Sequence, residues 1–424
     1  MKGKPFTSNS NVKVMQKTIL AHYNINNMRN ISLINNEIGP RVLVMSSNNN
    51  LVGKSFCHIL LNYSLKIGWT PIYCDLDLDN EINIPGCISA TVVDHVVPND
   101  FLIDNSISFY TGTKKENLNN FLYENQISEL GKLCIQKLEF DLNSWKKSKN
   151  LTNDNSNFCF VNSEYPTLYS SGMIINCPSL VINDKDRESS IYSTIIRDFR
   201  INLIYVIDNE KLFYDLKDLI NNNNNISIIL IPKIEGIELN SQYQNYMEEQ
   251  RLSFYFKGTF LNEAFEDTFE DTNEDTNEDT KIKFEDTKKN SAPLLNLKLT
   301  EFKLDLKQYK LIQIVSSNVS SDALPIEGSS DLNLVINEYK IDDDPLLYRI
   351  VEIVSLDEKD INDLDAIFEQ GKNNFVDLFS KAPVSFFGVI IKVDKNSNSI
   401  TICSPCNQLE HKYILIGDLK YSKI

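Results

Sequence analysis

Arg41-Val-Leu-Val-Met-Ser-Ser-Asn-Asn-Asn-Leu-Val-Gly-Lys-Ser55 is the stretch of this sequence that decides its fold. An apolar run leads into a polar loop that ends in Gly53-Lys54-Ser55, and the apolar spacing from Phe56 to Ile67 predicts a helix directly after it. In such a strand–loop–helix unit, backbone N–H groups face a phosphate chain, the lysine reaches the terminal phosphates and the serine hydroxyl ligates magnesium. The stretch therefore predicts a phosphate-binding loop.

One position of this loop departs from the usual pattern. The motif calls for a glycine five places before Gly53, and Asn48 stands there. Asparagine tolerates a positive φ better than most residues, which allows the turn at some cost. We therefore assign nucleotide binding to the whole loop and helix start, with Ser55 also as a magnesium ligand. The predicted nucleotide-binding residues are Asn48, Asn49, Asn50, Leu51, Val52, Gly53, Lys54, Ser55 and Phe56.

Length, composition and charge narrow the class of protein. The chain has 424 residues, of which 42% are hydrophobic and 24% charged, so it has room for two or three globular domains. A net charge of −16 excludes a broad basic surface for nucleic acid. The eight cysteines are scattered, several in apolar runs, which is typical of buried reduced thiols in a cytosolic or nuclear protein. No apolar run reaches membrane-spanning length and the first residues lack the apolar core of a signal peptide, so we expect no membrane contact.

From Arg41 to about Gly258, apolar strand-like runs alternate with helical patterns. Several of the runs are apolar without alternation, as in strands that a parallel sheet buries on both faces. This pattern predicts an α/β domain of P-loop NTPase type, with a parallel sheet and helices on both faces. The predicted strands are 42–46, 70–76, 106–110, 172–176, 201–207 and 226–232, and the predicted helices are 53–67, about 116–145, 187–199, 210–219 and 241–255.

The remaining segments differ in composition from this domain. Residues 1–38 form a lead-in with one helix over about 14–29, and residues 39–260 hold the α/β domain. Residues 261–292 repeat Glu-Asp-Thr, are acidic and contain few apolar residues, so we predict a disordered linker. Residues 293–424 form a smaller β-rich domain, with predicted strands at 311–315, 348–353, 385–393, 399–403 and 413–416.

Further segments carry a resemblance to a known family. They are Gly39-Pro-Arg-Val-Leu-Val, Leu76-Asp, Ile84-Pro-Gly-Cys-Ile-Ser-Ala-Thr, Gly172-Met-Ile-Ile-Asn-Cys-Pro-Ser, Tyr255-Phe-Lys-Gly and Gly388-Val-Ile-Ile. With the loop, they resemble the polyribonucleotide 5′-hydroxyl-kinase family, and within it the ATP-binding subunits of the mRNA 3′-end cleavage and polyadenylation machinery, of Clp type and fungal-like. That family begins with a β-rich domain of roughly a hundred residues. Here the loop lies near the start, so we expect that domain to be missing, through truncation or degeneration.

The resemblance assigns a role to Asp77, which follows the strand predicted over 70–76. The family keeps an aspartate at this place, where it can bind magnesium through water or accept the hydroxyl proton of a substrate. Asp77 is therefore our magnesium ligand beside Ser55, and the catalytic residue if the chain is a kinase. Strand alternation places Asp75 and Asp77 on the same side, so one of them can serve only to hold the other.

Other kinase positions differ from the family pattern. Ser179 stands where active members carry a tryptophan suited to stacking an RNA base. Glu248 and Ser253 stand where the lid arginines belong, with Arg251 nearby, and Asn176 replaces an acidic residue that often ends its strand. The loss of stacking platform and lid charge together argues against phosphoryl transfer to RNA.

Two other groups attract attention as possible sites. Cys403 and Cys406 have CxxC spacing with His411 nearby, but a metal site would need a second pair and a redox motif should open a helix, so we interpret them as incidental thiols. His58, on the helix after the loop, is interpreted as packed or solvated and not as catalytic.

The resemblance implies a nuclear, ATP-binding and non-catalytic scaffold in a cleavage factor IA complex. Its expected cofactors are ATP and Mg, and its expected direct partner is the scaffold subunit of that factor, with pre-mRNA contacted only indirectly. Bound ATP·Mg would stabilise the fold and the partner surface by mass action. Two alternatives stay open: an active RNA 5′-hydroxyl kinase, and a truncated or degenerate relative that binds no nucleotide.

Overall fold

The protein is described here by a computed structural model. The described residues are 9–46, 50–78, 84–94, 106–113, 120–154, 167–177, 185–220, 225–232, 241–257, 299–316, 334–339, 346–354, 376–406, 408–409 and 412–423. The acidic repeat predicted as a linker lies outside these residues, as do Asn48, Asn49, Ser179 and His411.

A seven-stranded sheet with the strand order β4-β3-β2-β5-β1-β6-β7 forms the first half of the molecule. Five neighbouring strands, from β2 to β7 in that order, are parallel, and the antiparallel strands β3 and β4 extend one edge. The strands are β1 (Arg41–Ser46), β2 (Ile72–Asp75), β3 (Cys87–Val92), β4 (Ser106–Tyr110), β5 (Met173–Asn176), β6 (Leu203–Ile207) and β7 (Ser227–Ile231). The strand β1, which leads into the predicted phosphate loop, is thus central.

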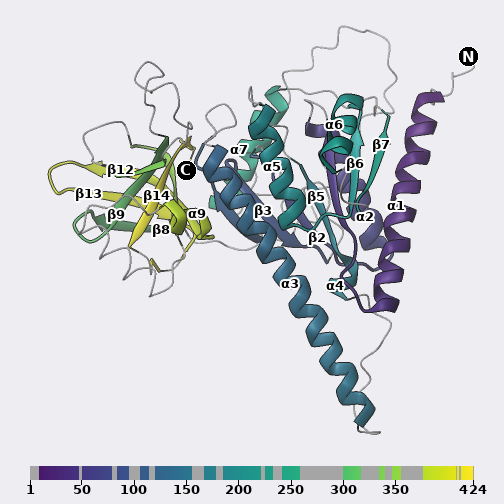
Figure 1. Ribbon diagram of the computed structural model, residues 1–424. Coiled ribbons are helices and arrows are strands. Elements are labelled where there is room, and N and C mark those ends of the chain that lie inside the picture. The colour runs from purple at the N-terminus through teal and green to yellow at the C-terminus, as the bar shows by residue number, and fades with distance from the viewer. Residues whose placement is uncertain are drawn as a thin grey trace, which may run out of the picture.

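Helices cover both faces of this sheet (Figure 1). Alternate residues of β1 point to opposite faces: Val42 and Val44 pack with α1 and α2, whereas Leu43 and Met45 pack with α3, α5 and α6. The helices are α1 (Asn9–Asn35), α2 (Asn50–Lys66), α3 (Asn120–Asp154), α4 (Leu168–Ser171), α5 (Lys185–Asp198), α6 (Glu210–Ile220), α7 (Ser241–Lys257) and, in the second half, α9 (Val376–Lys381). This arrangement confirms the predicted α/β fold class.

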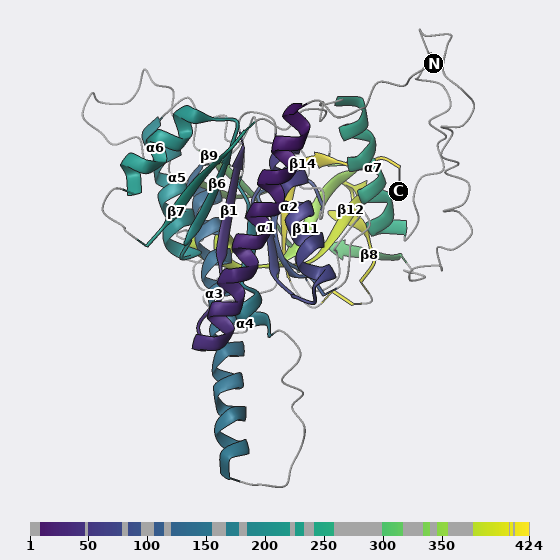
Figure 2. The same cartoon turned by 90° about the vertical axis from the view of Figure 1, so that its right-hand side faces the viewer.

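The first helix is fixed to the domain by a buried arginine. Arg29 of α1 is fully buried and donates to the Ser171 carbonyl at 2.8 Å and to the Ser64 hydroxyl at 2.6 Å. Burial lowers the pKa of Arg29 to about 9. These bonds tie α1 to α2 and α4, and Figure 2 shows α1 lying along the outside of the sheet.

A second seven-stranded sheet, β10-β9-β14-β11-β12-β13-β8, forms the rest of the described chain. Its pairs are antiparallel except for β14 with β9. The strands are β8 (Thr300–Asp305), β9 (Lys310–Ser316), β10 (Leu334–Glu338), β11 (Arg349–Val354), β12 (Val384–Asp394), β13 (Ser399–Ser404) and β14 (Tyr413–Lys420). This sheet confirms the prediction of a β-rich C-terminal part.

Aromatic side chains join the two sheets. Phe256, at the end of α7, stacks on Tyr421 with ring centroids 5.7 Å apart, and the Tyr255 hydroxyl accepts a hydrogen bond from the Phe387 N–H at 2.9 Å. Tyr110 of β4 packs edge-on against Phe387 of β12 at 5.4 Å. The Tyr-Phe segment that we quoted for its family resemblance therefore connects α7 to the C-terminal sheet.

Several predicted element boundaries were wrong. Strands β3, β8 and β10 were not predicted, because short strands without a clear run of apolar residues give little periodic signal. The helix α1 extends beyond both of its predicted ends, and α3 continues to Asp154, past its predicted end near Trp145. The added residues are mostly polar and carry little apolar periodicity, so the sequence pattern did not include them. The helix α2 begins at Asn50 and not at Gly53. Leu51 and Val52 can continue a helix, and no glycine precedes them to interrupt it.

Candidate phosphate-binding site

A buried ion pair lies where the phosphate loop was predicted. The Lys54 Nζ atom of α2 is 3.3 Å from the Asp77 Oδ2 atom, and the two residues are 4% and 0% exposed. Asp77 lies two residues beyond the end of β2, so both charges meet at the carboxyl edge of the parallel strands, where open α/β sheets bind ligands. Neither charge could be buried without a partner of opposite sign.

Asp75 and Asn176 form the floor of the site. They are register partners on the neighbouring strands β2 and β5, and the Asn176 Nδ2 atom donates to Asp75 Oδ1 at 2.9 Å. The same oxygen accepts the Asp77 N–H at 3.1 Å, so Asp75 holds the backbone of Asp77, as strand alternation suggested for one of the two acids. Burial raises the pKa of Asp75 to about 6; Lys54 and the Asn176 hydrogen bond oppose this rise, whereas Asp77 adds to it.

Gly53 lets the start of α2 approach these groups. A Cβ atom at this position would lie 2.9 Å from the Ser46 hydroxyl oxygen and 3.3 Å from Asn176 Oδ1. The first distance is too short for a side-chain carbon, so only glycine fits without a shift. The glycine therefore serves close packing of the helix start against the ends of β1 and β5.

Among the other predicted loop residues, Phe56 and Val52 pack in the core beneath α2, whereas Ser55 is partly open to solvent. Phe56 is fully buried edge-on against Tyr205, with ring centroids 5.7 Å apart, and Val52 packs at the edge of the same core. These two side chains support α2, so their part in phosphate binding would be through the backbone. Ser55 is half-buried. Because α2 begins at Asn50, the N–H groups that the helix leaves unpaired fall in its first turn, at or before Gly53.

The residues present suit a nucleotide with magnesium. Asp75 Oδ2 and Asn176 Oδ1 are buried polar atoms without a hydrogen-bond partner in the described part of the chain. Magnesium takes oxygen ligands and keeps several waters, and Ser55 and Asp77 could supply one oxygen each. In the described ranges no cluster of three or more His, Cys, Asp or Glu could hold a metal. An ion here would therefore depend on nucleotide phosphates, which Lys54 would neutralise.

Tyr123 supports the site although no sequence motif identifies it. Tyr123 of α3 is fully buried, and its hydroxyl donates to the Leu76 carbonyl, which lies between the two acids. This bond fixes the short segment that carries Asp77. Burial raises the pKa of Tyr123 well above its ordinary value, so the phenol stays protonated as a donor.

The helix that carries the predicted lid positions packs into the interface between the two sheets. Ser253 is fully buried, Arg251 is 4% exposed and Glu248 is half-buried. Leu252 and Phe256 of the same helix contribute to the core shared with the C-terminal sheet. A guanidinium could not swing out from Arg251 over a phosphoryl group without leaving this packing.

The remaining candidates lie elsewhere. His58 is half-buried with its ring edge-on to Tyr73, 5.8 Å between centroids, and so is packed. Cys403 and Cys406 are buried at the end of β13. The cysteines within the described ranges are buried and unbridged. None of the described helices has the length and apolarity needed to cross a bilayer.

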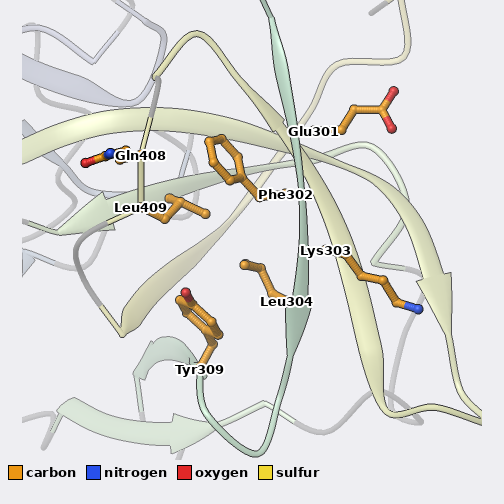
Figure 3. Close-up of a pocket in the computed structure, with 7 residues that line it drawn as sticks. All are labelled: Glu301, Phe302, Lys303, Leu304, Tyr309, Gln408 and Leu409. Carbon is orange, nitrogen blue, oxygen red and sulfur yellow. The ribbon is translucent and has the colours of Figure 1, made fainter.

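A separate hollow of about 460 Å³ opens on the C-terminal sheet. Figure 3 shows Phe302 and Leu304 of β8 turned toward Tyr309 and Leu409, while Glu301 and Lys303 point away. The lining consists of Glu301, Phe302, Lys303, Leu304, Tyr309, Gln408 and Leu409, all from the C-terminal part of the chain. The hollow therefore has no residue in common with the Lys54 site.

Comparison with known proteins agrees with this geometry. The family model described as mRNA cleavage and polyadenylation factor CLP1 P-loop matches residues 49–149 and 143–258. The chain is 26% identical over 276 residues to the mRNA cleavage and polyadenylation factor CLP1 of Scheffersomyces stipitis, covering 59% of this chain and 54% of that protein. It is 29% identical over 226 residues to a CLP1 homolog of Drosophila mojavensis, covering 52% and 46%. The chain thus spans about half the length of the curated relatives it matches.

Solved structures extend the similarity of fold across both sheets. A structure of the interface between Pcf11p and Clp1p aligns with a TM-score of 0.66 at 19% identity, covering 96% of this chain and 80% of that one. A second structure, of the wild-type Clp1p–Pcf11p complex, aligns with a TM-score of 0.65 over 96% and 79%. Both halves of the described chain therefore have the fold of the Clp1p subunit.

Proposed function

Through residues 49–258 the chain belongs to the CLP1 P-loop family, and from this premise we propose that it is an ATP-binding, non-catalytic scaffold subunit of the pre-mRNA 3′-end cleavage and polyadenylation complex. The observation that carries the proposal is the buried pair of Lys54 and Asp77, with Ser55 next to Lys54 in the sequence. These are the lysine, the acid and the hydroxyl that a triphosphate with magnesium requires.

The charges of the site support the proposed nucleotide binding. In the absence of nucleotide, Asp77 neutralises Lys54. The phosphates of ATP would take over that role, and a magnesium ion would in turn neutralise Asp77. ATP·Mg would then fix β2, β5 and the start of α2 in one arrangement. It would stabilise the folded chain by a free energy that grows with the logarithm of its concentration over the dissociation constant.

The residues at the lid positions support the proposal that the chain is not catalytic. Phosphoryl transfer needs positive charge placed on the moving group, and an arginine in that role contributes roughly 10³–10⁵ in rate in related systems. Glu248 and Ser253 carry no positive charge, and Arg251 is packed in the interface between the sheets. Together with Ser179 at the base-stacking position in the sequence, this favours a scaffold over a kinase.

The relatives support a proposal for the partner and the place of action. The similar proteins are named as mRNA cleavage and polyadenylation factors, and the similar solved structures are complexes of Clp1p with Pcf11p. We take the direct partner of this chain to be a Pcf11-type scaffold subunit of cleavage factor IA. The chain would act in the nucleus and reach pre-mRNA only through that complex.

The test combines nucleotide binding with phosphoryl transfer. Isothermal titration of the purified chain with ATP·Mg should detect weak binding that Lys54→Ala abolishes. Incubation with labelled ATP and an RNA oligonucleotide bearing a 5′-hydroxyl should transfer no more label than the Lys54→Ala control. Transfer clearly above that control would replace the scaffold by an active 5′-hydroxyl kinase. Absence of binding would leave a relative that takes no nucleotide.

A further inference from the structure

We infer that Asn176 is the positioning residue of the nucleotide site, because its side chain holds Asp75 on one side and faces the glycine of the phosphate loop on the other. The inference rests on the proposed nucleotide binding and adds a residue to it. Asn176 is fully buried at the end of β5. That strand lies between β2, which carries the acids, and β1, which leads to the loop.

Hydrogen bonds fix the orientation of the amide. The ionised carboxylate of Asp75 can only accept, so the group 2.9 Å from its Oδ1 must be the Asn176 Nδ2 donor. The Asn176 Oδ1 atom consequently points to the other side, where it lies 3.3 Å from the position of a Cβ on Gly53. The backbone adds a third link, since the Asn176 carbonyl accepts the Leu76 N–H at 3.1 Å.

These links place one side chain between the two parts of the site. A displacement of Asn176 would move Asp75, which holds the N–H of Asp77, and Asp77 is the partner of Lys54. The same displacement would change the contact surface for Gly53 at the start of α2. Asn176 would act through Asp75 and not by contact with a phosphate. It sets the distance between the acid that would face magnesium and the lysine that would face the phosphates.

With Asp75 opposite it in this chain, an amide is the side chain that suits position 176. An aspartate at residue 176 would place two carboxylates within hydrogen-bond distance, and both cannot be ionised there. A leucine of similar size would leave the buried Asp75 carboxylate without its side-chain donor, which is costly in an apolar surrounding. Exchange of the two residues would instead restore the hydrogen bond between them with donor and acceptor reversed. The Asp77 N–H would lose its acceptor at the same atom, so the exchange restores the site only in part.

The test uses this exchange in the full chain. ATP·Mg affinity is measured by titration for the wild type, Asn176→Asp, the double variant Asp75→Asn/Asn176→Asp, and the control Asn202→Asp. Asn202 accepts the Arg41 N–H at 2.8 Å at the opposite end of β1, so its replacement adds a carboxylate to the same sheet far from the acids. The double variant has the same net charge as the wild type.

We expect Asn176→Asp to weaken ATP·Mg binding by about tenfold or more and the control Asn202→Asp to stay within about twofold of the wild type. The double variant should recover part of the loss, because it restores the hydrogen bond between residues 75 and 176 but not the acceptor of the Asp77 N–H. The inference is overturned if Asn176→Asp is folded and binds like the wild type, or if the exchange restores nothing. A wild type that binds no ATP·Mg would overturn the proposed function instead. In that case the hydrogen bond between Asn176 and Asp75 is tested by thermal unfolding without nucleotide. Equal unfolding midpoints for the wild type and Asn176→Asp would show that this hydrogen bond does not support the site.

Discussion

Lys54 and Asp77 form an ion pair with 3.3 Å between Nζ and Oδ2, and both side chains are almost completely shielded from water. The lysine that would bind a terminal phosphate is therefore held by an internal anion. A nucleotide must displace that carboxylate or bring a magnesium ion to satisfy it. The pair thus links the stability of the fold to the occupancy of the site.

Replacement of Lys54 by methionine should destabilise the nucleotide-free chain. It leaves Asp77 buried without its cation, and the loss of one partner from a buried pair costs roughly 3–5 kcal/mol. Chemical unfolding measures the effect. Asp77→Asn in the same chain should recover part of the loss, because it removes the stranded charge.

A matched control lies on the same helix. Lys66 is exposed in the last turn of α2, so Lys66→Met should change the free energy of unfolding by no more than about 0.5 kcal/mol. If Lys54→Met were as mild as this control, the ion pair would contribute nothing to the fold.

Glu352 should make stability fall as pH rises. It is buried on β11 at the junction of the two sheets, opposite Phe387, and neither carboxylate oxygen has a hydrogen-bond partner among the described residues. Burial raises the pKa of Glu352 well above its ordinary value, and Cys87 and Tyr110 are the titratable groups that sense its charge. The folded chain thus binds a proton that the unfolded chain releases, so this contribution is full below the unfolded pKa and is lost as pH rises toward the folded pKa.

Glu352→Gln keeps the shape of the side chain and removes the charge. We expect it to unfold at a higher temperature than the wild type at pH 8, with the gap narrowing toward pH 5. Glu301→Gln, at an exposed position of β8, should show no such trend. A gap that stayed constant from pH 5 to pH 8 would mean that Glu352 does not titrate between the folded and unfolded states.

Removal of residues 263–290 should leave the thermal midpoint nearly unchanged. The composition of this stretch predicts a linker, and it falls between the end of α7 and the start of β8. The closure entropy of a loop changes slowly with its length, so a shorter connection costs little. A drop of many degrees in the melting curve of the deleted chain would instead indicate that the stretch packs.

The phosphate site was predictable in part from local sequence. Gly53, Lys54 and Ser55 are adjacent, so a motif was enough to predict them, and the family resemblance added Asp77 at the end of a recognisable strand. The hydrogen bond between Asn176 and Asp75 was not predictable, because it joins residues 101 positions apart through the register of two strands. Tyr123 is a similar case, since its hydroxyl reaches Leu76 from a helix with no polar motif. The fold class followed from the alternation of apolar runs and helical patterns, whereas the ends of α1, α2 and α3 did not, because apolar periodicity gives its weakest signal at the ends of a helix.

A pull-down with a Pcf11-type scaffold subunit should recover this chain. The reason is that the Clp1p fold persists through both sheets, although the positions that a kinase would use carry other residues. A scaffold needs surface and stability, which are properties of the two sheets and of their shared core around Phe256 and Tyr421. Lys54→Ala should therefore lose partner binding only as far as it loses stability. A stabilising concentration of an osmolyte should then restore partner binding. Loss of binding by a variant that is demonstrably folded would place the phosphate site within the interface itself. Failure of the folded wild type to bind would mean that these two sheets do not carry the interface.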